Sequence, residues 1–122
     1  MSFITEMDFG NDIDGWIDFQ VKFSLFKEKP ELLPKKVRRT FEKHDMGHTN
    51  LVCSVAFSDD EMKKAQIISE GIIRWVLFTG VYPKKPKNQQ ENDDLILFYY
   101  GLGKCKNPDE AREYLQGLGI GG

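Results

Sequence analysis

A strict alternation of apolar and polar side chains between Trp16 and Leu25 is the strongest pattern in this chain. The apolar positions on one side are Ile17, Phe19, Val21, Phe23 and Leu25. A period of two is typical of a β-strand with one buried face. The pattern therefore predicts a strand over residues 16–25.

The residues before this segment predict a second strand and a tight turn. Phe3, Met7 and Phe9 share one side, and the polar segment 11–15 ends in Asp-Gly, which suits a turn. We therefore expect an N-terminal β-hairpin.

A short helix is expected after Pro30. Its apolar residues Leu33, Val37 and Phe41 are spaced by four, and Gly47 is expected to end its final turn in a left-handed conformation. A brief strand over residues 51–57 follows.

The second half begins with a helix signal. Ser58 and Glu61 have the spacing of a capping box, in which each side chain bonds the backbone N–H of the other residue. We favour one helix that ends near Gly80. The alternative is a helix that stops at Gly71 and a strand over residues 72–82, which are rich in β-branched and aromatic side chains.

The remaining segments predict a loop, a strand and a last helix. Residues 83–94 are polar, and the nearly continuous apolar run from Leu95 to Tyr100 predicts a central strand. Asn107 and Pro108 suit the cap and the first position of a helix.

These elements predict a single α+β domain over residues 1–122. Their order is ββαβαβα, which predicts a small, mostly antiparallel sheet packed against two or three helices. With 40% hydrophobic residues, the chain has enough apolar material for a core. It has no apolar run of membrane-spanning length and no N-terminal signal pattern, so we expect a soluble cytoplasmic protein with reduced thiols.

The charge is unevenly distributed along the chain. The formal net charge is −2, yet residues 1–20 carry five acids and no Lys or Arg, and residues 22–43 carry eight bases against three acids. The two groups either balance each other inside the fold or face partner molecules. In the second case the candidate partner-binding residues are Asp12, Asp14, Asp18, Lys35, Lys36, Arg38 and Arg39.

His44 and His48 are weak metal candidates. Their spacing of four resembles that of zinc peptidases, in which both imidazoles lie on one face of an intact helix. Gly47 lies where the helix should end, and no third ligand is evident. We therefore expect no metal and no cofactor.

A glycine-containing turn after the predicted central strand is a candidate anion site. Its residues are Gly103, Lys104, Lys106 and Asn107, although the full phosphate-loop pattern is missing. Cys105, between two lysines, is the more plausible thiolate, and Cys53 is expected to be a small buried hydrophobe.

Without a complete catalytic signature, the sequence favours a binding module over an enzyme and leaves enzymatic activity open. The leading hypothesis is docking to another protein, as by a toxin-neutralising immunity protein or a phage-type inhibitor. The alternative is a nucleotide-binding or small-anion-binding domain, with or without enzymatic activity, that uses the Gly101–Asn107 turn. Nucleic-acid binding through the basic helix is less favoured, membrane binding is not expected, and the oligomeric state stays open.

Overall fold

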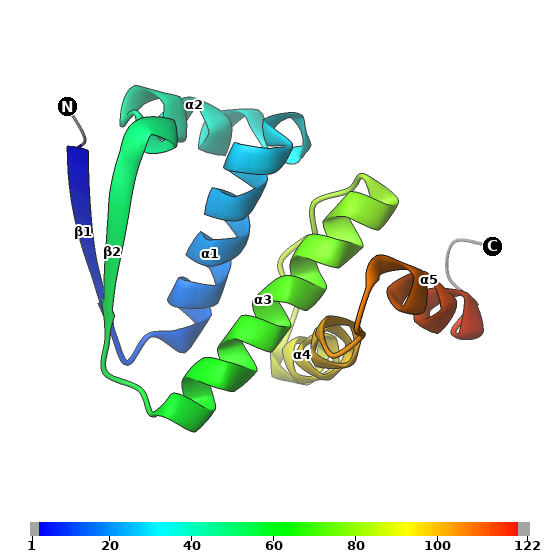
Figure 1. Ribbon diagram of the computed structural model, residues 1–122. Helices are drawn as coiled ribbons and strands as arrows, with labels where there is room; N and C mark the ends of the chain where they lie inside the picture. The colour runs from blue at the N-terminus through cyan, green and yellow to red at the C-terminus, as the bar shows by residue number, and fades with distance from the viewer. Residues whose placement is uncertain (1–2, 120–122) are drawn as a thin grey trace. The chain divides into compact units, whose positions relative to one another are not determined.

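Residues 3–119 of the computed structural model form five α-helices, two short 3-10 helices and one two-stranded parallel sheet (Figure 1). The chain divides into two compact units, Met1–Met62 and Lys63–Gly122. We call them the first and the second unit and describe each by itself.

The sheet of the first unit contains strands β1 (Phe3–Gly10) and β2 (Thr49–Val55). The strands are parallel, with Thr5 opposite Leu51 and Met7 opposite Cys53. A parallel pair needs a long crossover connection, and here helices α1 and α2 provide it. The predicted antiparallel sheet is therefore wrong, although a strand near residues 51–57 is confirmed.

Helix α1 (Ile13–Glu28) replaces the predicted strand over residues 16–25, so the N-terminal hairpin is wrong. The alternating apolar residues include Ile17, Val21 and Leu25, which are spaced by four and bury one side of a helix. Asp12 caps this helix, and its carboxylate accepts a hydrogen bond from the Gly15 N–H at 2.9 Å.

The second helix of this unit is confirmed, but it is shorter than predicted, because Leu33 lies before its start, and its flanks differ. The 3-10 helix η1 (Pro30–Leu32) precedes it, and α2 (Lys35–Lys43) begins directly after Pro34. The left-handed residue after α2 is Asp45, with φ 54°, because Gly47 lies inside the 3-10 helix η2 (Met46–His48). The expected left-handed Gly47 is therefore wrong.

Helix α3 (Asp59–Thr79) confirms the continuous helix and excludes the alternative strand over residues 72–82. The capping box is present. The Ser58 N–H donates to Glu61 Oε1 at 3.1 Å, and the Glu61 N–H donates to Ser58 Oγ at 3.2 Å.

Helix α4 (Gln89–Gly103) contains the segment Leu95–Tyr100, so the predicted central strand is wrong. Asn88 starts this helix by accepting a hydrogen bond from the Glu91 N–H at 2.9 Å. The last helix, α5 (Pro108–Gly117), is confirmed, since Asn107 accepts from the Glu110 N–H at 2.8 Å.

Each unit has buried apolar side chains of its own. In the first unit, aromatic rings connect the sheet to both helices, because Phe19 of α1 lies 5.7 Å from Phe9 and 5.9 Å from Phe41 between ring centroids. In the second unit the buried cluster is Leu102, Cys105, Ala111 and Leu115, against which Trp75, Phe78, Phe98 and Tyr114 pack.

The α+β class is thus confirmed, but the element order is not ββαβαβα. Among residues 3–119 the order is one strand, two α-helices, the second strand and three α-helices. No helix in this part of the chain combines the length and apolar character needed to cross a membrane. The assignment of one domain stays a prediction.

Candidate functional site

Helix α2 carries the densest group of cations in the first unit. Its nine residues include five bases and one acid. Val37 and Phe41 face inward, and Phe41 packs against Phe19 and Phe26, with ring centroids 5.9 and 5.4 Å apart. Because this apolar side fixes the helix, the basic residues are left on the outer side.

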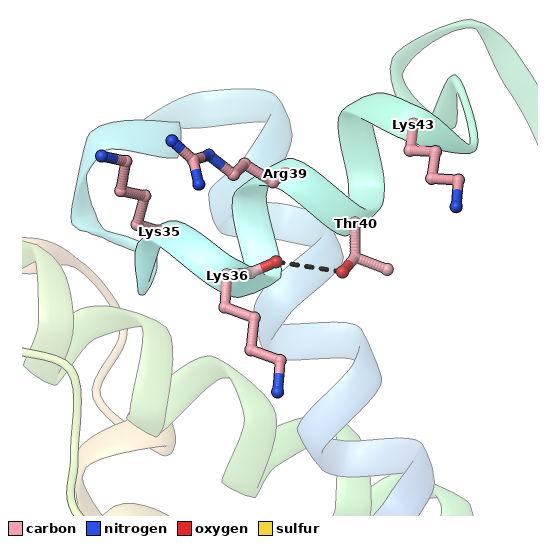
Figure 2. Close-up of a pocket in the computed structure, with 5 residues that line it drawn as sticks. All are labelled: Lys35, Lys36, Arg39, Thr40 and Lys43. Atoms are coloured by element: carbon pink, nitrogen blue, oxygen red, sulfur yellow. Dashed lines mark hydrogen bonds between the residues drawn. The ribbon is translucent and has the colours of Figure 1, made fainter.

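A shallow depression on the outer side of α2 is lined by Lys35, Lys36, Arg39, Thr40 and Lys43 (Figure 2). We call its four cations, Lys35, Lys36, Arg39 and Lys43, the α2 basic face. Thr40 Oγ1 donates to the Lys36 carbonyl oxygen at 3.0 Å, so this hydroxyl is tied to its own helix. All five side chains are exposed.

The cations of the α2 basic face are not neutralised by ion pairs within the described part of the chain. Within residues 3–119, no ion pair joins any of its four cations to a carboxylate. Arg38, the fifth base of α2, lies 3.9 Å from Glu42, and such an exposed pair adds little stability. Of the predicted basic set, the structure therefore brings Lys35, Lys36 and Arg39 together and pairs Arg38 with an acid.

The position of two lysines at the N-terminal end of α2 strengthens the positive potential there. Lys35 and Lys36 stand in its first turn, where the unpaired backbone N–H groups and the helix dipole are also positive. Cations at this end of a helix are electrostatically unfavourable. They make the first turn of α2 a strong attractor for negative groups.

Asp12 and Asp14 stand at the N-terminal end of α1, and Asp18 follows one turn later. This end of α1 lies near the C-terminal ends of both strands (Figure 1). Asp12 is occupied as a helix cap, and Asp18 forms an ion pair with Lys22 at 2.6 Å. Asp14 is exposed in the first turn of α1. The predicted acidic set is therefore partly used for local structure.

Sequence reasoning missed a second acidic group at this end. Asp59, Asp60 and Glu61 begin α3 directly after β2, and the parallel pairing places the end of β2 beside that of β1. The first unit thus has a positive face on α2 and a negative end at the sheet, with α1 between them. Predicting that the two acidic groups lie at the same end would have required knowing that the two strands run parallel.

The histidines lie just after α2 and are both exposed. His48 Nδ1 is 2.8 Å from Asp45 Oδ1. Over residues 3–119 the structure has no cluster of three or more His, Cys, Asp or Glu side chains arranged to hold a metal ion.

The candidate anion site has a different setting from the predicted one. Gly103 ends a helix rather than following a strand, and Lys104 lies over the Tyr100 ring, 5.0 Å from its centroid. Arg74 donates to the carbonyl oxygens of Leu102 and Cys105 at 2.9 and 2.6 Å, so its guanidinium is engaged by the α4–α5 connection. The side chain of Asn107 is likewise engaged as a cap, and Lys106 is exposed. Anion binding by these residues stays a prediction.

Neither thiol has the surroundings of an activated nucleophile. Burial raises the pKa of the Cys105 thiol, the Glu110 carboxylate adds to the rise, and Arg74 opposes it only in part. Burial also raises the pKa of Cys53, against the lowering effect of a hydrogen bond from Gln20. Burial and the raised pKa therefore speak against a Cys105 thiolate, because burial outweighs the nearby positive charge of Arg74.

Protein-family models, curated proteins and solved structures were each compared with the chain, and none of them matches it.

Proposed function

We propose that this chain is a docking protein that binds an acidic surface of another protein through the α2 basic face. The observation that carries the proposal is the group of four exposed cations around one depression, which no carboxylate in the described part of the chain neutralises. Such a face attracts acidic surfaces at long range and speeds association with them.

The geometry of α2 suits protein binding because its cations lie on a helix that is packed against α1. Phe41 packs against Phe19 and Phe26, so the cations project from a helical scaffold rather than from a loop. A helical scaffold lowers the entropy that is lost on binding. Arginine in particular forms paired hydrogen bonds with carboxylates, and Arg39 is available for them.

The charge of the rest of the first unit argues against a nucleic acid as the partner. A helix of nine residues is only about 14 Å long, and beyond it the acidic end of the sheet would repel a continuing phosphate backbone. The aromatic side chain of α2, Phe41, is packed between Phe19 and Phe26 and is not placed for base stacking. A compact acidic protein surface avoids both problems.

The proposal extends to the class of small proteins that neutralise a target by covering its surface, as immunity proteins and phage-type inhibitors do. Such proteins work by affinity and need no chemistry of their own.

Binding of defined probes tests the proposal. A fluorescent peptide of about ten alternating Asp and Glu residues and a fluorescent DNA duplex of about 20 base pairs are titrated with the full chain, at about 0.05 M and about 0.2 M salt. Fluorescence anisotropy measures both dissociation constants. We expect the peptide to bind more tightly than the duplex.

A matched pair of variants locates the binding face. Replacement of Lys35, Lys36 and Arg39 by Gln removes three positive charges from α2. Replacement of Lys84, Lys85 and Lys87 by Gln removes three from the segment between α3 and α4. We expect at least about tenfold weaker peptide binding for the first variant and little change for the second. Equal losses in both, no binding of the peptide, or tighter binding of the duplex would each contradict the proposal, the last in favour of a nucleic-acid function.

A further inference from the structure

The sheet of the first unit has only two strands, so each strand has one edge that no other strand of residues 3–119 joins. Within residues 3–119, β1 and β2 pair only with each other. A strand at an open edge presents backbone N–H and C=O groups that can pair with another chain, and proteins usually block such edges.

The edge of β1 carries blocking features. Glu6 and Asp8 are exposed and alternate along this strand with the half-buried residues Thr5, Met7 and Phe9, so they lie on its outer face. The register also shifts between Asp8 and Gly10, which marks a bulge or irregularity. Charges and bulges on an edge strand disfavour pairing with a further strand.

The edge of β2 carries no such feature. Residues 49–58 contain no Asp, Glu, Lys, Arg, Gly or Pro. On the outer face of β2, Val52 is 49% exposed and lies between Asn50 and Ser54, which are exposed as well. An uncharged, extended segment rich in β-forming residues is suited to pair with another strand.

We infer that β2 pairs in antiparallel fashion with β2 of a second copy of this chain, around a two-fold axis at Val52. The two sheets then join into one sheet of four strands, with β1 of each copy at the outside. A two-fold axis perpendicular to the sheet keeps the inner faces of both copies on one side, where each α1 covers its own pair of strands.

The sequence of β2 is complementary to itself in this register. Asn50 stands opposite Ser54 of the second copy, Val52 stands opposite its own equivalent, and Leu51 stands opposite Cys53 on the inner face. Over the central residues 50–54, polar residues therefore meet polar residues and apolar residues meet apolar ones, while Thr49 at the end of the strand stands opposite Val55. Directly opposed pairs of matching character stabilise antiparallel strands.

The same test disfavours β1 as the self-pairing strand. Antiparallel pairing around Met7, near its centre, would place Glu6 opposite Asp8 of the second copy, twice in each dimer. Like charges directly opposite each other are destabilising. The choice of a second copy as the occupant thus rests on the contrast between the two strands, and it is independent of the α2 basic face.

Sedimentation of the full chain over a wide range of protein concentrations tests the inference. We expect a reversible dimer that persists at about 0.5 M salt, since the paired residues of β2 are uncharged. A chain that stays monomeric at every concentration overturns the inference and leaves β2 as an edge for an extended segment of another protein.

Charge variants test the register. N50K/S54K places Lys opposite Lys at two positions and is expected to weaken the dimer at least about tenfold, as is N50E/S54E. An equimolar mixture of the two variants places Lys opposite Glu and is expected to dimerise again. The control I4K/E6K places two lysines on the outer face of β1 and is expected to dimerise like the unmodified chain.

Circular dichroism confirms that each variant is folded, which is expected because all substituted side chains are exposed. Equal weakening by the control, or a mixture that fails to dimerise, contradicts pairing through β2. Peptide binding by the α2 basic face, measured on the same variants, should not change, so failure of one proposal is distinguishable from failure of the other.

Discussion

Replacement of Gly71 by Ala should destabilise the second unit, because α3 and α4 come very close at this residue. A Cβ atom at Gly71 would collide with the carbonyl oxygen of Tyr99, and one at Gly103 would collide with the carbonyl oxygen of Ile67. Both obstacles are backbone atoms of helices, which cannot rotate away as a side chain can. The G71A substitution therefore forces the two helices apart.

The size of the effect follows from two opposing contributions. Alanine is more favourable than glycine inside a helix by about 1 kcal/mol. Overpacking of a filled site costs about 1–3 kcal/mol, and a collision with backbone belongs at the upper end of that range. We therefore expect a net loss of about 2 kcal/mol in the free energy of unfolding, or a fall in Tm of about 8 °C at roughly 4 °C per kcal/mol.

Unfolding by urea and by heat, followed by far-ultraviolet circular dichroism, measures this loss. The matched control is G117A, at the last residue of α5, where an added Cβ meets no atom within 4 Å. The control should keep its stability or gain up to about 1 kcal/mol from helix propensity. If G71A is as stable as G117A, the close approach of α3 and α4 at Gly71 is refuted.

Three further predictions concern Arg74 in the same unit and the thiols of both units. R74M removes the hydrogen bonds to the Leu102 and Cys105 carbonyl oxygens and should lower the free energy of unfolding in urea by about 2–3 kcal/mol. R74K should recover part of this loss. A loss below about 0.5 kcal/mol in R74M would contradict this role of Arg74. Cys105, 8% exposed, should react with iodoacetamide more slowly than Cys53 at neutral pH, and both should react more slowly than a free thiol. Mass spectrometry measures the three rates. Equal rates for Cys105 and Cys53 would speak against burial as the cause of the slow reaction. Folding raises the pKa of both thiols, so the thiols contribute fully to the free energy of unfolding below the pKa of an unfolded thiol, and this contribution is lost as the pH rises above about 9. The loss of stability at high pH that is due to the thiols should be absent in C53A/C105A.

The starts of α3 and α5 were the part of the fold that the sequence predicted best. Ser58 with Glu61 and Asn107 with Glu110 form the expected caps, since a cap depends on residues only three apart. Local interactions of this kind need no knowledge of the rest of the chain.

Two apolar segments were predicted as strands because their patterns fit a strand as well as a helix. Between Trp16 and Leu25, apolar residues at alternate positions include a subset spaced by four, and the cap at Asp12 selects the helix. The run Leu95–Tyr100 fits a strand by length, and the deciding signal was upstream at Asn88, where the helix starts.

The candidate site was predicted in part. The spacing of Val37 and Phe41 placed the bases of α2 on the outside, as observed. The shared acidic end of the first unit was not predicted, because it depends on whether two strands more than 40 residues apart run parallel or antiparallel. Periodicity within each strand carries no information on that choice.

The bonds from Arg74 to the end of α4 also bear on how the second unit folds. Leu102 lies in the last turn of α4, and its carbonyl oxygen accepts from Arg74, 28 positions earlier in the chain, as well as from the Cys105 N–H at 3.3 Å. The Cys105 carbonyl oxygen, in the connection after α4, accepts from the same guanidinium, 31 positions earlier in the chain. The end of α4 therefore gains part of its stability from α3, so the two helices stabilise each other as the second unit folds.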